Sequence, residues 1–238
     1  MTYRAVVFDL FGTLVPSMRD SDYFQSLRET AAAVGAEPDE FCRLWVRRDL
    51  VELRSNGTFA DQAEFIEHLC GIMGVAAERD AVRKAAQCRA EFDRMLLVPR
   101  QDALDVLSRL KRARLKLCLM SVASRDAPGI WPSLPLAPLF DAALFSCEVG
   151  LIKPDPRFYA LACEAVAAGP HECMYVGDGA GDELTGARNA GMHPVLICPP
   201  DEEDVILSRE QCRNWRGAKV QSLSELPALL GLAEQAPR

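Results

Sequence analysis

The sequence contains no long hydrophobic run, no Cys-x-x-Cys pair and no basic patch with interleaved aromatic residues. A run of about 20 apolar residues is needed to cross a bilayer, so no membrane-spanning segment is expected. The first apolar run is short and is interrupted by Asp9, which does not fit a signal peptide. We therefore expect a soluble, cytoplasmic protein without a membrane partner.

Positive charge is also scarce. Lys and Arg number 27 against 34 Asp and Glu, which gives a formal net charge of −7. Because nucleic-acid-binding domains carry basic surfaces, this balance argues against a nucleic-acid partner. Hydrophobic residues make up 49% of the 238 residues and charged residues 26%, as in ordinary globular enzymes with a substantial core. We expect a small-molecule partner and a monomeric or homodimeric protein.

The nine cysteines show no spacing typical of a disulfide framework or a zinc site. They are odd in number and scattered, and several lie in apolar runs, such as Cys118 and Cys198. Disulfide frameworks and zinc sites use regular spacings, which are missing here. Buried, reduced thiols are therefore expected, as in a cytosolic protein.

Short apolar runs alternate with helical segments along most of the chain. The runs lack strict polar–apolar alternation, which is typical of strands covered on both faces. Strand alternating with helix predicts right-handed crossovers and a doubly wound, Rossmann-like parallel sheet of the α/β class. The expected strands are 5–10, 115–122, 142–149, 173–178, 193–198 and 219–223, and the expected helices between or after them are 101–113, 155–168, 180–191 and 224–234.

The long gap between the first two strands contains no convincing strand. Residues 17–98 show four amphipathic helical patterns, the second of which spans 40–54. An all-helical insertion directly after the first strand would form a lid over the carboxyl end of that strand. We therefore predict a core domain of residues 1–16 and 99–238 and a helical cap domain of residues 17–98.

Polar residues follow the predicted strands where each strand ends. In doubly wound sheets, ligands bind outside the carboxyl ends of the strands, so side chains at those ends converge on one pocket. The candidates are Asp9, Thr13, Ser121, Lys153, Asp178, Asp182 and Glu183, with Ser124 in reserve for Ser121.

The order and spacing of these residues resemble the haloacid dehalogenase superfamily of hydrolases. That family opens with a strand and Asp-x-[Asp/Tyr/Phe]-Gly-Thr, matched here by DLFGT at 9–13. Its strand-end Ser or Thr is matched by Ser121, and its Lys, often before Pro, by Lys153. Its Gly-Asp with a second acid four or five residues on is matched within 177–183. The helical insertion stands where the family places its type-1 cap, so the resemblance covers almost the whole chain.

The resemblance implies a Mg²⁺ site made of oxygen ligands. Asp9, the backbone carbonyl of Phe11 and Asp178 would hold the ion, with Asp182 or Glu183 as the further acid. The four-residue spacing favours Asp182, whereas counting back from the Ala-Gly-Met that follows favours Glu183.

The resemblance also implies a covalent mechanism. Asp9 would be the carboxylate nucleophile, which splits one difficult displacement into two easier ones. Lys153 would hold the nucleophile and neutralise the transferring group. Thr13, Ser121 and the loop at Gly12 would bind the oxygens of the substrate.

Phe11 departs from the phosphatases of this family. They usually carry a second Asp two residues after the nucleophile, which acts as general acid and base and contributes about 10²–10⁴-fold in rate. An aromatic residue there is familiar from the family's haloacid dehalogenases, whose halide leaves without a proton. Those enzymes need no metal and usually replace the first acid of the fourth motif, which this chain keeps as Asp178.

We therefore expect a Mg²⁺-dependent phosphatase of a small phosphorylated metabolite, atypical because of Phe11. The first alternative is an (S)-2-haloacid dehalogenase that takes a halogenated substrate. The second is a catalytically weak member that binds a phosphorylated ligand or a protein.

Overall fold

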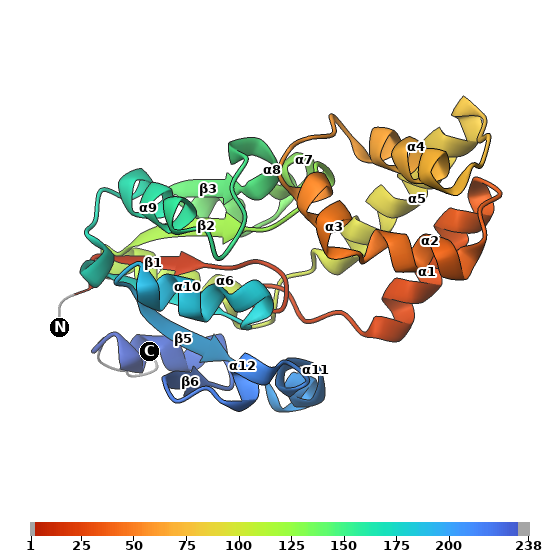
Figure 1. Cartoon of the computed structure of the whole chain (residues 1–238). Helices are drawn as coiled ribbons and strands as arrows, with labels where there is room; N and C mark the ends of the chain where they lie inside the picture. The colour runs from red at the N-terminus through yellow and green to blue at the C-terminus, as the bar shows by residue number, and fades with distance from the viewer. Residues whose placement is uncertain (1–2, 233–238) are drawn as a thin grey trace.

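The computed structural model describes residues 3–232, and a six-stranded parallel sheet of order β3-β2-β1-β4-β5-β6 lies at its centre (Figure 1). The strands are β1 (Ala5–Phe8), β2 (Lys116–Ser121), β3 (Ala142–Phe145), β4 (Cys173–Gly177), β5 (His193–Ile197) and β6 (Ala218–Val220). β1 pairs with β2 on one side and with β4 on the other. The strand order reverses at β1, so the switch point of this doubly wound sheet lies at the carboxyl end of β1.

Helices cover both faces of the sheet, which confirms the predicted α/β class. Val6 and Phe8 of β1 face the core shared with α6 (Ala103–Arg112) and α13 (Leu226–Leu229), whereas Ala5 and Val7 face the opposite core. The second core is shared with α9 (Pro156–Ala165) and α10 (Glu183–Asn189). All four β1 residues are fully buried, which explains their uninterrupted apolar sequence.

Five helices fill the insertion after β1 and form the lobe on the right of Figure 1. They are α1 (Asp20–Ala33), α2 (Pro38–Trp45), α3 (Arg48–Ser55), α4 (Gln62–Met73) and α5 (Arg79–Leu96). Their buried residues, among them Leu27, Trp45 and Phe65, form a core of their own, apart from the two cores of the sheet. For the domain boundaries we propose the ranges predicted from the sequence: 1–16 and 99–238 for the core, 17–98 for the cap.

The single helix predicted over 40–54 is wrong. Helix α2 ends at Trp45 with Val46 as its C-cap. Arg47 then has an extended backbone before α3 begins. The buried face of α2 carries Phe41, Leu44 and Trp45. A continuous helix would bring Arg48 and Asp49 onto that buried stripe, so the break keeps these charged side chains in water.

Several other predicted elements are shorter in the structure. The third strand ends at Phe145, and residues 146–149 form the short α8 (Ser146–Val149). The helix predicted over 180–191 begins as a 3₁₀ turn, because Gly181 and Asp182 have positive φ, and becomes α-helical at Glu183. In the predicted helix 224–234, α13 covers only 226–229, and 233–234 lie outside the described residues.

Three further short helices complete the fold: α7 (Asp126–Ile130), α11 (Glu203–Leu207) and α12 (Glu210–Arg213). Within residues 3–232, every helix is too short or too polar to span a membrane.

Asp141 joins the start of β3 to β2. Its carboxylate accepts hydrogen bonds from Leu117 N at 2.9 Å, Lys111 Nζ at 2.6 Å and Lys116 Nζ at 2.9 Å. Partial burial alone would raise the pKa of Asp141, but these donors outweigh it and lower the pKa to about 2. A lowered folded-state pKa stabilises the fold above the unfolded value near pH 4. That contribution is lost as the pH falls through about 2.

We predict that Asp141→Asn lowers the free energy of unfolding by about 1 kcal/mol at pH 7, since water screens part of this attraction. The difference from the wild type shrinks as the pH falls from 4 towards 2. Urea unfolding at several pH values measures it. A difference independent of pH would contradict the proposed charge interaction.

Candidate active site

Asp9 and Asp178 lie next to each other at the switch point of the sheet. Asp9 directly follows β1, and its N–H donates to Val176 O of the neighbouring β4 at 2.9 Å. Asp178 directly follows β4. Pairing of the two strands therefore brings together two carboxylates that are 169 positions apart, and both are buried, with 6% and 2% exposure.

Glu183 completes a cluster of three buried carboxylates. Asp9, Asp178 and Glu183 each offer one oxygen, and these oxygens lie within 4.8 Å of one another. Hard divalent cations such as Mg²⁺ prefer carboxylate and carbonyl oxygens, so the donor set fits such an ion. Asp182, the other candidate for the further acid, is exposed and outside this cluster.

Lys153 lies between two of the three acids. Its Nζ donates to Asp9 Oδ1 at 2.5 Å and to Glu183 Oε2 at 2.7 Å, and Lys153 is 6% exposed. Burial alone would lower the pKa of Lys153, but Asp9 and Glu183 outweigh it and raise the pKa, so the side chain is an ammonium. Burial also raises the pKa of Asp9; Lys153 opposes this effect, while Glu183 and Asp178 add to it. Lys153 therefore contacts Asp9, the residue that the resemblance implies is the nucleophile.

Glu183 is held in place by the backbone and by Tyr175. Its Oε1 accepts from Gly179 N at 2.8 Å, and its Oε2 also accepts from Tyr175 OH at 2.6 Å. A Cβ at Gly177 would overlap the Glu183 carboxylate, so the glycine of the Gly-Asp motif makes room for it. The backbone of this loop, with positive φ at Gly181 and Asp182, places Glu183 in the cluster and Asp182 outside it.

Asp178 is paired with Arg209, a residue that the sequence did not single out. Arg209 Nη1 donates to Asp178 Oδ2 at 2.7 Å and to its backbone oxygen at 2.8 Å. Gly12 approaches the same carboxylate with φ at 77°, and a Cβ there would overlap it. Arg209 precedes α12, far from any strand end, and no motif around it indicates this contact.

Two of the predicted hydroxyls are buried without a hydrogen-bond partner in the described part of the chain. Thr13 and Ser121 are fully buried, and neither Oγ atom has a hydrogen-bond partner within the described part of the chain. Buried hydroxyls are normally satisfied, so oxygens of a bound ligand are the natural acceptors here. Ser124, held in reserve, lines the adjoining cavity, and the intervening Ala123 N donates to Ser146 Oγ at 3.0 Å.

A buried ion pair supports the loop after Asp9 from outside. Arg100 donates to the carbonyls of Gly12 at 2.9 Å and Thr13 at 2.8 Å, and to Glu202 Oε1 at 2.5 Å. Glu202 Oε2 accepts from Ser17 N at 2.7 Å. The pair thus connects the start and the end of the helical insertion with the segment after β5. Arg100 stands in a loop and Glu202 ends a three-residue 3₁₀ turn, so no periodicity in the sequence indicates either residue.

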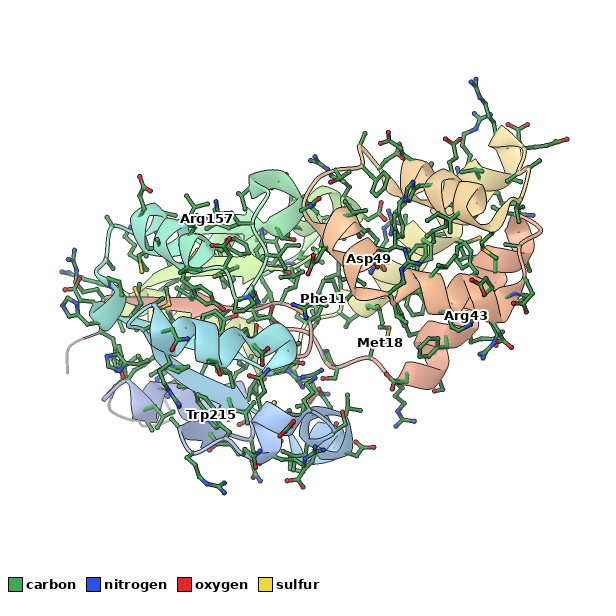
Figure 2. The ribbon with its side chains drawn as sticks, viewed as in Figure 1. Phe11, Met18, Arg43, Asp49, Arg157 and Trp215 are labelled. Carbon is green, nitrogen blue, oxygen red and sulfur yellow. The ribbon has the colours of Figure 1, made fainter. Side chains whose placement is uncertain are left out.

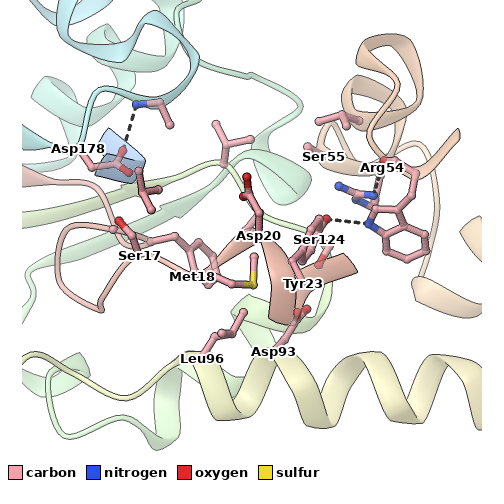
Figure 3. Close-up of a pocket in the computed structure, with 18 of the residues that line it drawn as sticks. Ser17, Met18, Asp20, Tyr23, Arg54, Ser55, Asp93, Leu96, Ser124 and Asp178 are labelled. Atoms are coloured by element: carbon pink, nitrogen blue, oxygen red, sulfur yellow. Dashed lines mark hydrogen bonds between the residues drawn. The ribbon is translucent and has the colours of Figure 1, made fainter. Parts of the chain in front are cut away.

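A cavity of about 410 Å³ separates the carboxylate cluster from the helical lobe (Figure 3). Phe11, at the junction of the two lobes in Figure 2, lines it together with Gly12 and Asp178. The helical side contributes Tyr23, Trp45, Arg54, Arg89 and Asp93, among others.

The chain matches one protein family over most of its length. A model of the haloacid dehalogenase-like hydrolases matches residues 3–191. The chain is 28% identical over 234 residues to an (S)-2-haloacid dehalogenase of Burkholderia cepacia, over 95% of this chain and 94% of that protein. It is also 28% identical over 233 residues to a phosphatase of Mycobacterium tuberculosis, over 97% and 98% of the two chains.

Solved structures with the same fold again include both activities. A 2-haloacid dehalogenase from Pseudomonas syringae has a TM-score of 0.71 at 20% identity, over 97% of this chain and 99% of that chain. A phosphatase from Thermococcus onnurineus has a TM-score of 0.66 at 19% identity, over 97% and 98% of the two chains. At these identities the likeness concerns the fold alone.

We predict that Glu202→Gln lowers the free energy of unfolding by about 3 kcal/mol, because it leaves the buried Arg100 guanidinium without its counter-charge. The matched control is Glu172→Gln, which breaks the pair with Arg4, whose side chain is 60% exposed. We expect less than about 1 kcal/mol from the control. Urea unfolding measures both, and equal small losses would show that the Arg100–Glu202 pair does not support the loop.

Proposed function

The chain belongs to the haloacid dehalogenase-like hydrolases, and we propose that it is a Mg²⁺-dependent phosphatase of a small phosphorylated molecule. The cluster of three buried carboxylates carries this proposal. Only Lys153 and Arg209 are paired with these carboxylates in ion pairs of the described residues, so one negative charge is left over. An anionic substrate would add to it, and a divalent cation offsets both.

Asp9, Asp178 and Glu183 would hold the ion, together with the backbone carbonyl of Phe11. Bound Mg²⁺ would shield the repulsion between an anionic nucleophile and an anionic phosphate and orient the two. The exposed Asp182 is not part of this proposed ligand set.

In the proposed reaction Asp9 attacks the phosphorus atom, and the alcohol leaves as the acyl-phosphate forms. Lys153, at 2.5 Å from Asp9, holds the carboxylate and neutralises charge on the transferring group. The unpaired hydroxyls of Thr13 and Ser121 donate to phosphate oxygens. Water then cleaves the acyl-phosphate and releases Asp9 and phosphate.

Proton transfer to the leaving alcohol needs a residue other than Phe11, because Phe11 carries no titratable group. Glu183 is engaged by Lys153, Tyr175 and Gly179. Of the acids that line the cavity, Asp178 and Asp93 are paired with arginines, whereas Asp20 is exposed at the start of α1. We assign proton transfer to Asp20.

A 2-haloacid dehalogenase is the second candidate. Phe11 favours it, because halide needs no proton on leaving, and the relatives include dehalogenases as well as phosphatases. The two activities differ in metal dependence and in the product released. A member that only binds its ligand would be stabilised by that ligand without turnover.

We predict phosphate release from p-nitrophenyl phosphate that requires Mg²⁺, stops with a chelator and falls by at least about 10³-fold in Asp9→Asn, which lacks the nucleophile. Chloride release from 2-chloropropionate is measured in parallel on the same protein. Chloride release without added metal, together with no phosphate release, would overturn the phosphatase and establish the dehalogenase.

We predict that Phe11→Asp raises the turnover of alkyl phosphates by about 10–100-fold, because it supplies a general acid for a poor leaving group. The gain is smaller for p-nitrophenyl phosphate, whose leaving group needs little protonation. Phe11→Asn is the matched control without an acid. Asp20→Asn is expected to slow alkyl phosphate turnover in the parent and not in Phe11→Asp. A gain with Phe11→Asn equal to that with Phe11→Asp would exclude acid catalysis as the reason.

A further inference from the structure

Arg54 is a cation on the cap side of the cavity. Its guanidinium lies over the rings of Trp45 and Phe65, with Cζ at 4.7 and 5.2 Å from the ring centroids, and Nη1 donates to Trp45 O at 3.1 Å. No carboxylate among residues 3–232 forms an ion pair with it. Burial lowers the pKa of Arg54 and Arg89 adds to this effect, whereas Tyr23 and the carboxylate of Asp93 oppose it. The side chain keeps some accessible surface where it lines the cavity (Figure 3).

Arg89 places a second guanidinium on the same wall. Its side chain is 3% exposed, with Nη1 donating to Ser26 Oγ at 2.9 Å and Nη2 to Asp93 Oδ1 at 3.3 Å. Its Nε has no partner in the described part of the chain. Asp93 pairs with Arg89 and also attracts Arg54, so the two guanidiniums share one carboxylate.

The buried charge on the cap wall is therefore positive. Arg54 and Arg89 contribute two positive charges and Asp93 one negative charge. Asp20 also lines the cavity, but it is exposed at the start of α1, where water screens it. Two guanidiniums that are largely shielded from water and share one carboxylate are costly to maintain, and a ligand anion would reduce that cost. Gln62, 4% exposed, also lines the cavity, and its Oε1 has no partner among the described atoms.

We propose that the substrate carries a second anionic group, a carboxylate or a second phosphoryl group, which binds Arg54 while the first phosphoryl group faces Asp9. This inference rests on the proposed phosphatase function and specifies its substrate class. A guanidinium offers a planar pair of donors that matches either anion, and stacking on Trp45 and Phe65 holds that plane in place. The cavity has one wall for each group: Gly12 and Asp178 on the sheet side, Arg54 on the cap side.

Calorimetry on Asp9→Asn with Mg²⁺ tests the proposal without turnover. Three probe series of matched length are compared: alkyl phosphates, ω-carboxyalkyl phosphates and alkanediol bisphosphates. We expect one of the anionic series to bind about 10–100-fold more tightly than the alkyl phosphates, since each hydrogen bond to a charged group contributes strongly. The series that binds more tightly than the alkyl phosphates identifies the second group as a carboxylate or a phosphate.

The quantity compared is the ratio of the affinity of the tighter anionic series to that of the alkyl phosphates. In the double variant Asp9→Asn, Arg54→Gln we expect this ratio to be close to one. Arg54→Lys retains part of it, because the charge stays while the planar donor pair is lost. Arg48→Gln, on the same helix and with a 94% exposed side chain, is the matched control and keeps the full ratio. The ratio is informative because a general loss of folding weakens all series alike.

Equal binding of the three series would overturn the second-anion proposal and leave the phosphatase function standing. If the anionic series still binds more tightly in Arg54→Gln, Arg54 does not bind the second anionic group and its role is packing alone. Binding of none of the series would overturn the phosphatase function and, with it, this inference.

Discussion

The ammonium group of Lys153, placed between Asp9 and Glu183, is the interaction on which the site depends. It joins three segments that are distant in sequence: the end of β1, the loop after β3 and the start of α10. Without it, two buried carboxylates would repel each other at the centre of the sheet. Gly12 and Gly177 allow this close approach because a Cβ at either would overlap an acid of the cluster.

The carboxylate cluster and the cap wall carry opposite net charges on the two sides of the cavity, and of the cluster only Asp178 lines it. The sheet side holds three carboxylates against two cationic side chains, whereas the buried cap side holds two guanidiniums against one carboxylate. Such an arrangement suits a cation at one end and an anionic ligand that reaches the other. The Arg100–Glu202 pair connects both chain crossings between the lobes, so the loop that carries Gly12 and Thr13 is fixed where cap and core meet.

The sequence predicted the parts of this site that follow from strand ends. Asp9 and Asp178 directly follow apolar strands, Ser121 ends one, and Lys153 lies beyond the short helix that follows another; a parallel sheet brings such positions together. Arg209, Arg100 and Glu202 could not be predicted, because they lie in irregular segments where neither periodicity nor spacing indicates a contact. The choice between Asp182 and Glu183 depended on positive φ at Gly181 and Asp182, which residue types alone did not determine. The break at Val46 depended on which face of α2 is buried.

The central claim is that Asp9, Asp178 and Glu183 together hold a divalent cation. Crystals grown with Mn²⁺, an ion that also prefers oxygen ligands, allow the ion to be located by its anomalous scattering. We expect one ion in contact with these three carboxylates, and its loss in Asp178→Asn. A wild-type crystal with no ion at the cluster, and with the Arg209 guanidinium still on Asp178, would contradict it.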